Sequence, residues 1–150
     1  LVEDSSKRGI VVVGQSGTPR AAVTVSGNTV RRSGSGLLAF YTKRLVVSNN
    51  SFTRSQAIGV YLDHHNADFQ VTGNTFTDMW SNSAWTAGIH TAASGNTNTG
   101  TISGNTLARG SKQATYLNDY GYYYRGGRTG ITVGTNNFAT ATSNPVAGEK

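Results

Sequence analysis

Carboxylates are scarce in this 150-residue chain, and two of them are spaced closely enough to act together. Between Asp4 and Glu149 the chain holds only Asp63, Asp68, Asp78 and Asp119. Glycoside hydrolysis generally uses two carboxylates about 5–9.5 Å apart. Asp63 ends a predicted strand and Asp68 closes the five-residue loop after it, so we expect them to face one another as a hydrolytic pair. In the alternative interpretation, Asp68 caps a turn and Asp63 is a solvated side chain.

Histidine and tyrosine residues gather around the same loop. His64 follows Asp63, and His90 lies on the next repeat beside Tyr61 in an outward column. Histidine acts as acid or base near neutral pH, so His90 or Tyr61 is a candidate base for β-elimination, and His64 a candidate substrate contact. The alternative is that repeat geometry alone brings the histidines together. Asp63, His64 and His90 lack a recognisable metal-binding spacing, so we predict no metal and no cofactor.

Aromatic and basic residues are concentrated in two insertions, residues 79–87 and 120–130. Loops carry function more often than the scaffold does, aromatic rings stack on the C–H faces of sugars, and arginine clamps carboxylates with two hydrogen bonds. We therefore expect substrate binding by Trp80, Trp85, Tyr122, Tyr124, Arg125 and Arg128. Equally, these residues could cover coil ends or form an interface with another chain, where the same residue types are enriched.

A repeat positions these residues. Its five copies are VTVSGNTV (23–30), LVVSNNSF (45–52), FQVTGNTF (69–76), GTISGNTL (100–107) and ITVGTNNF (131–138). Apolar residues at i and i+2 form a strand with one buried face, and the Gly-Asn or Asn-Asn that follows turns a corner. Stacked coils about 4.8 Å apart would bury a continuous core, which a single repeat cannot do. The aligned residues Asn28, Asn50, Asn74, Asn105 and Asn136 are predicted to form a hydrogen-bonded ladder.

A second strand precedes each repeat from the second onward. These strands are GLLAF (36–40), GVYLD (59–63), GIHTA (88–92) and, less regularly, TYLND (115–119). With their glycines in register, Leu37, Val60 and Ile89 point inward. The same register predicts an outward column of Leu38, Tyr61, His90 and Tyr116.

Composition and charge narrow the class of protein. The residues are 36% hydrophobic and 13% charged, and Gly, Ser, Thr and Asn are abundant, which indicates an all-β chain and disfavours a helical bundle. The net charge of +6 favours polyanionic partners, but the cations are dispersed, so we expect no nucleic acid partner. There is no cysteine to form disulfides, and no apolar run is long enough to span a membrane.

The pattern resembles the right-handed parallel β-helix superfamily of pectate-lyase-like proteins. Residues 59–76, GVYLDHHNADFQVTGNTF, match that superfamily's repeat nearly end to end. The resemblance implies a single domain over residues 1–150: a single-stranded right-handed parallel β-helix of about five coils over residues 9–138, with a tail at 139–150. Members usually stack more coils and begin with an amphipathic capping helix. We therefore expect this chain to be part of a larger β-helix, either docked to further coils or self-associated as a homo-oligomer such as a trimer.

Two functions are compatible with this resemblance, because lyases, hydrolases, epimerases and phage tailspikes share the architecture. The first is a carbohydrate-active module that binds an anionic polysaccharide and could cleave it by hydrolysis or β-elimination. The second is a non-enzymatic segment of a phage tailspike or surface adhesin, with a structural or receptor-binding role. Either function places the protein outside the cell or on a virion surface.

Overall fold

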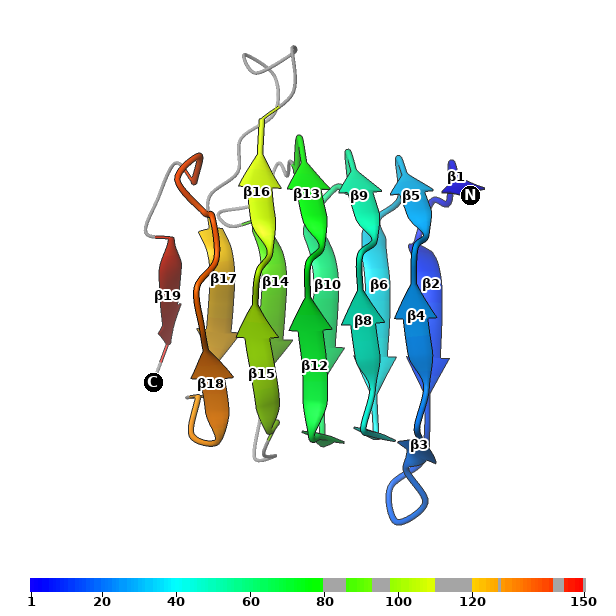
Figure 1. Ribbon diagram of the computed structural model, residues 1–150. Helices are drawn as coiled ribbons and strands as arrows, with labels where there is room; N and C mark the ends of the chain where they lie inside the picture. The colour runs from blue at the N-terminus through cyan, green and yellow to red at the C-terminus, as the bar shows by residue number, and fades with distance from the viewer. Residues whose placement is uncertain (80–85, 93–97, 110–119, 127, 142–144, 150) are drawn as a thin grey trace.

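The computed structural model describes residues 1–79, 86–92, 98–109, 120–126, 128–141 and 145–149. These residues form four parallel β-sheets that run along the molecule from the N-terminal to the C-terminal end (Figure 1). The chain winds through the sheets coil after coil, so the predicted β-solenoid of about five turns is confirmed. The described part of the chain contains no helical segment suited to crossing a membrane.

Three of the sheets form the walls of the solenoid. Sheet 1 contains β2 (Arg8–Val13), β6 (Ser35–Phe40), β10 (Ile58–Asp63), β14 (Ala87–Ala92), β17 (Tyr120–Arg125) and β19 (Val146–Glu149). Sheet 2 contains β4 (Thr24–Ser26), β8 (Val46–Ser48), β12 (Phe69–Thr72), β15 (Gly100–Ser103) and β18 (Ile131–Val133). Sheet 3 contains β1 (Val2–Glu3), β5 (Thr29–Arg31), β9 (Ser51–Thr53), β13 (Thr75–Thr77) and β16 (Thr106–Ala108).

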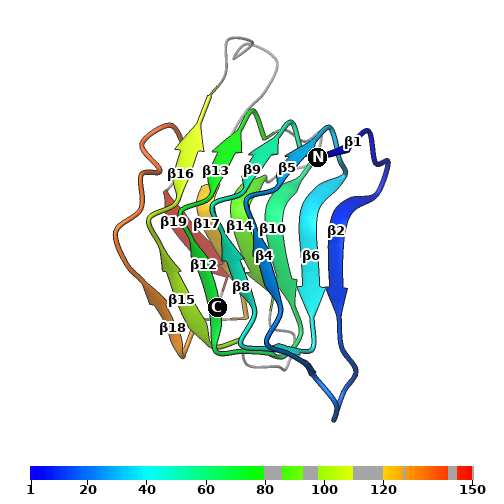
Figure 2. The ribbon, with the colours of Figure 1, turned by 45° about the vertical axis from the view of Figure 1, so that its right-hand side comes forward.

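A short fourth sheet, here called the corner sheet, joins sheet 1 to sheet 2. It contains β3 (Arg20–Ala21), β7 (Thr42–Lys43) and β11 (Asn66–Ala67). The second coil runs from β6 in sheet 1 through β7 at the corner to β8 in sheet 2 and β9 in sheet 3, and the third coil repeats this order with β10 to β13. Figure 2 shows the strands of the three larger sheets following one another in this way. Figure 1 shows sheet 1 behind sheets 2 and 3, with the corner sheet at the lower edge.

The predicted register of sheet 1 is confirmed. Val60 pairs with Leu37 on one side and with Ile89 on the other, and all three side chains are fully buried. In sheet 2, the predicted core column is buried at Val25, Val47, Val71 and Ile102, while Val133 is half-buried. The interior is thus a stack of apolar columns that continue from one coil to the next.

The strand predicted for residues 115–119 lies outside the described residues, and a different segment pairs with β14. This segment is β17, whose Tyr122 and Tyr123 lie opposite Ile89 and His90. Residues 120–125 therefore belong to the solenoid wall and not to an insertion, because Gly121 and Tyr122 fit the positions of Gly88 and Ile89. Pairing also extends beyond the expected coil limits, through β1 with β5 and β19 with β17.

The predicted asparagine ladder is present along the corner between sheets 2 and 3. Asn74 shows its geometry: its side-chain Nδ2 donates to Asn105 Oδ1 at 3.0 Å and to the Val47 carbonyl at 2.8 Å. Its Oδ1 accepts from both the backbone N and Nδ2 of Asn50, each at 3.0 Å. The same contacts link Asn28 to Asn50 and Asn105 to Asn136. Each buried amide therefore satisfies the backbone of a neighbouring coil.

A second polar ladder, not predicted from the sequence, runs beneath the corner sheet. Thr42 Oγ1 donates to Asn66 Oδ1 at 2.7 Å, and Asn66 Nδ2 donates to Asn98 Oδ1 at 3.1 Å. All three side chains are buried. Asn98 Nδ2 continues to the Ala92 carbonyl at 2.9 Å, so this ladder fixes the corner where sheet 1 ends.

The glycines at the start of the sheet 1 strands make room for rings from sheet 3. Phe52 and Phe76 stack in the core with ring centroids 5.4 Å apart. A Cβ on Gly59 would lie 2.2 Å from Phe76 Cδ1, and a Cβ on Gly36 would lie 2.4 Å from Phe52 Cδ1. Sheets 1 and 3 are therefore interlocked through glycine facing phenylalanine.

We predict that Asn74→Ala destabilises the fold by about 2–4 kcal/mol, because it leaves buried groups of Asn50 and Val47 without hydrogen bonds. Asn28→Ala is the matched control, since Asn28 is only half-buried and accepts no bond from a preceding asparagine in the described ladder. Denaturant unfolding should show less than about 1 kcal/mol for the control. Equal losses in the two variants would contradict the energetic role of the buried ladder.

Gly59→Ala should cost about 1–3 kcal/mol, because the added methyl group overpacks the core against Phe76. At Gly88 the corresponding Cβ would lie 3.1 Å from Phe76 Cδ2, so Gly88→Ala should be milder. Thermal melting of both variants measures the difference. The added Cβ would also lie 2.6 Å from the Gly88 carbonyl oxygen, so a Gly59→Ala protein as stable as the wild type would show that both the Phe76 ring and this backbone can shift at no cost.

Candidate functional site

The outer face of sheet 1 carries an aromatic column in the register predicted for Tyr61 and His90. The Tyr61 and His90 rings are stacked, with centroids 4.9 Å apart and planes 16° from parallel. Tyr123, and not the predicted Tyr116, occupies the next place, and its ring meets His90 edge-on at 5.2 Å. Three neighbouring strands, β10, β14 and β17, thus contribute one ring each.

Most of this column is covered. His90 is 2% exposed and Tyr123 8% exposed, while Tyr61 is half-buried. Stacking on a sugar requires an open ring face, which His90 and Tyr123 do not present. Tyr61 is therefore the accessible member of the column.

His90 is electrostatically unsuited to the acid–base role predicted for it. Burial, assisted by the positive charge of Arg125, lowers the pKa of His90 to about 4. The imidazole is neutral at pH 7, and a group with so low a pKa is a weak base. His90 acts instead as a buried aromatic spacer between Tyr61 and Tyr123.

Asp63 and His64 form a close pair at the end of β10. His64 Nδ1 lies 2.8 Å from Asp63 Oδ1, and both side chains are partly exposed. Burial, and then the charge and hydrogen bonding of Asp63, raise the pKa of the Tyr61 phenol. Tyr61 stays protonated at neutral pH and is therefore a hydrogen-bond donor, not the base that β-elimination would need.

Asp68 occupies a different part of the coil from Asp63. It lies just after β11 in a left-handed backbone conformation with φ of 56°, and its backbone N donates to Thr99 Oγ1 at 3.1 Å. Asp63 ends sheet 1, whereas the exposed Asp68 precedes sheet 2, so β11 separates the two carboxylates. This placement matches the turn interpretation of Asp68 given by the sequence.

The residues predicted as a sugar platform are dispersed. Tyr122 is fully buried, its hydroxyl lies 2.8 Å from Thr91 Oγ1, and burial raises its pKa to about 12. A direct substrate contact for Tyr122 is therefore wrong, because its place in β17 points it into the core.

Tyr124 is half-buried beneath the Arg128 guanidinium, which lies 5.8 Å from the ring centroid. Arg125 is exposed at the end of β17. Trp80 and Trp85 lie outside the described residues.

A second cluster, which the sequence analysis missed, lies at the corner sheet. The Tyr41 ring lies 5.7 Å from the His64 ring and 5.8 Å from the His65 ring. The signal was present in the sequence: YTKR and HHNAD occupy the same loop in successive coils, so stacking brings them together.

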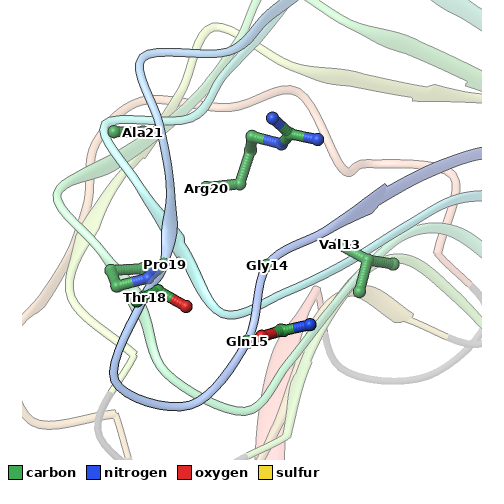
Figure 3. A pocket seen from close by; sticks show the side chains of 7 residues that line it. All are labelled: Val13, Gly14, Gln15, Thr18, Pro19, Arg20 and Ala21. Atoms are coloured by element: carbon green, nitrogen blue, oxygen red, sulfur yellow. The ribbon is translucent and has the colours of Figure 1, made fainter.

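Next to this cluster, the loop of residues 14–19 separates two open recesses. One, of about 450 Å³, is lined by Val13, Gly14, Gln15, Thr18, Pro19, Arg20 and Ala21 (Figure 3). The other, of about 300 Å³, lies between the same loop and the residues Tyr41, Thr42, Lys43, His65 and Ala67. Across the described residues, no group of three His, Asp or Glu side chains is placed to hold a metal ion.

Comparison with known families agrees with this architecture. The family described as right-handed β-helix region matches residues 1–138. The chain belongs to this family. Comparisons with curated proteins and with solved structures found no match for this β-helix chain. Membership therefore establishes a right-handed parallel β-helix. It does not determine the activity, because the same fold carries different activities that depend on the side chains at the site.

The buried histidine of this β-helix predicts a pH-dependent stability. An unfolded histidine binds a proton below about pH 6.5, whereas folded His90 resists protonation down to about pH 4. Stability should rise with pH across this window and be lost as the pH falls through it, by up to about 3 kcal/mol.

His90→Phe keeps an aromatic ring but removes the titration, so its unfolding free energy should vary less between pH 4 and 7 than that of the wild type. His65→Phe, at an exposed histidine, is the matched control and should retain the wild-type slope. Denaturant titrations at several pH values measure both slopes. An unchanged slope in His90→Phe would contradict the lowered pKa.

Proposed function

We propose that this right-handed β-helix is a polysaccharide-binding module that contacts an acidic sugar chain on the outer face of sheet 1. The contact surface consists of Tyr61, Asp63 and Arg125, and is here called the Asp63–Arg125 surface. An extended sugar chain requires a long, regular surface, which stacked parallel strands supply.

The observation that carries the proposal is the outer column at the ends of β10, β14 and β17. Asp63 pairs with Ala92, and Ala92 pairs with Arg125, so a carboxylate and a guanidinium flank a small side chain. Two strand spacings separate β10 from β17 by about 10 Å. The Ala92 side chain between them is only 8% exposed, so Asp63 and Arg125 supply the polar contacts of this surface. Arg125 supplies a bidentate partner for a carboxylate, and Asp63 accepts hydrogen bonds from hydroxyl groups.

Charge favours an acidic sugar over a neutral one. The chain has a net charge of +6, and the positive charges of Arg125 and Arg8 both act on Tyr61 from strands two positions away in sheet 1. Positive surfaces raise the local concentration of polyanions and accelerate their binding.

The same geometry favours binding over cleavage. Hydrolysis requires a second carboxylate opposite Asp63, and Asp68 lies beyond β11. Elimination requires a base, whereas His90 is buried and neutral and the pKa of Tyr61 is raised. A module that binds polysaccharide would work outside the cell or on a virion surface, where such chains are found.

Arg125→Ala should weaken binding to acidic oligosaccharides about tenfold and affect neutral ones of equal length much less, because only the acidic chain offers a carboxylate partner. Arg31→Ala is the matched control, since Arg31 is exposed on sheet 3 and pairs with Glu3 at 3.4 Å. Calorimetric titration gives both affinities. Equal losses for acidic and neutral sugars would mean that Arg125 only supports the strand end.

Cleavage is tested separately by incubating the wild type and Asp63→Asn with a panel of polysaccharides and measuring released ends. Asn keeps the size of the side chain but removes its charge and basicity. If the module binds without cleaving, neither protein should release product. Product from the wild type alone would make Asp63 catalytic, and absence of both binding and product would favour the structural role in a tailspike or adhesin.

A further inference from the structure

The loop of residues 14–19 is held rigidly against the second coil. Gly14 N donates to the Phe40 carbonyl at 3.0 Å, and Arg20 N donates to the Tyr41 carbonyl at 2.9 Å. Within the loop, Gln15 and Thr18 exchange backbone hydrogen bonds of 3.3 and 3.1 Å across a tight turn. A Cβ on Gly14 would lie 2.1 Å from the Tyr41 carbonyl oxygen, so glycine is needed for this approach. The recess beside the loop is therefore preformed.

Three successive coils line the 300 Å³ recess. Gln15 and Pro19 come from the first coil, Tyr41 and Lys43 from the second, and His65 from the third. Figure 3 shows the loop from close by, with Gln15 and Pro19 labelled on it. Because the recess depends on the stacking of coils, no single coil could form it.

The corner sheet presents one long cationic side chain between two small ones. Lys43 pairs with Ala21 on one side and Ala67 on the other, and the Lys43 side chain is exposed. Lys43 is also one of the residues that line the recess. Arg20 and Arg44 add positive charge at this corner, and the carboxylate of Asp68, which follows β11 on the third coil, adds a negative charge.

Tyr41 and His65 form the aromatic wall of the recess, and His64 contacts Tyr41 as well. His64 is paired to Asp63 at 2.8 Å and contacts the Tyr41 ring at 5.7 Å. The His65 ring lies 5.8 Å from Tyr41, tilted by 37°, so the two rings form an angled wall. Rings of this kind offer apolar faces to C–H groups together with polar edges.

We propose that this recess binds one hexuronate residue of an acidic polysaccharide. Tyr41 and His65 contact the faces of the sugar ring, Lys43 neutralises its carboxylate, and the Gln15 amide donates to and accepts from its hydroxyl groups. A volume of about 300 Å³ is at the lower limit of ligand pockets, which suits a single sugar unit. A simple anion would leave the aromatic wall unused. The proposal shares the ligand class of the proposed function but uses a different set of residues.

The experiment uses tetrasaccharides of pectate, alginate and hyaluronan, each compared with its carboxyl-reduced form. Lys43→Met removes the charge but keeps most of the side-chain length, and should raise the dissociation constant about tenfold for an acidic tetrasaccharide that the wild type binds. Lys7→Met is the matched control, because the exposed Lys7 lies just before β2, at the opposite end of sheet 1 from the corner. The reduced sugars should bind Lys43→Met and the wild type equally.

Tyr41→Asn tests the aromatic wall. Tyr41 has a φ of 53°, and asparagine tolerates this left-handed conformation, so the corner should keep its shape. Binding should weaken for both the acidic and the reduced sugars, unlike the charge-selective effect of Lys43→Met. Thermal melting of each variant verifies that the fold is intact.

Backbone amide shifts on titration with the acidic tetrasaccharides separate this proposal from the Asp63–Arg125 surface. Shifts at Gln15, Lys43 and His65 support the recess, even if the residues around Arg125 do not move. Shifts confined to the Asp63–Arg125 surface would overturn the recess while leaving the proposed function intact. Equal affinity of Lys43→Met and Lys7→Met, or no shifts in the recess with any acidic tetrasaccharide, would also overturn it.

Discussion

The structure depends on one requirement: each buried asparagine amide has to find its partners on the neighbouring coils. Asn50, Asn74 and Asn105 are almost fully buried, and a buried amide without partners is costly. Its bonds to the next asparagine and to the backbone of the preceding coil form in one register only. A slip of one residue would break the ladder and turn the apolar columns outward at the same time. The ladder therefore specifies which residues stack, in addition to stabilising the corner.

The same register determines which side chains are neighbours on the outer surface of sheet 1. Once Val60 is held opposite Leu37 and Ile89, Tyr61 is necessarily beside His90, and Asp63 beside Ala92. The glycine–phenylalanine contact between sheets 1 and 3 strengthens the constraint, because the Phe76 ring can pack only against a residue that has no Cβ, as Gly59 does. The packing of the core thereby fixes the relative positions of outward side chains that come from separate coils, although these side chains themselves contribute little to stability.

Much of this arrangement could be predicted from the sequence, because apolar residues at i and i+2 followed by asparagine repeat in every coil. The position of β17 could not, since Tyr122 replaces the aliphatic residue expected at an inward position and TYLND offered a competing pattern. Register alone also places His90 outward without revealing that it is buried, because burial depends on what packs over the sheet. The ladder of Thr42, Asn66 and Asn98 was hidden because its members come from loops of unequal length.

The corners are where this fold can vary its chemistry. Tyr41, His64 and Asp68 all adopt left-handed backbone conformations at the corner sheet, a geometry that disfavours most side chains other than glycine, asparagine and aspartate. The hydrogen bonds of the stacked coils impose this conformation, so the side chains there are free of core packing and point away from it. A tyrosine and a histidine at such positions add nothing to the buried columns, yet they form the contacts around His64 and beside Lys43. The same left-handed conformation recurs at Arg32, Arg54 and Asp78, just after the strands of sheet 3, so it is a general feature of the coil corners. What distinguishes the corner between sheets 1 and 2 is the type of side chain placed there, and a tyrosine beside two histidines and a lysine supplies both apolar and polar contacts to a ligand.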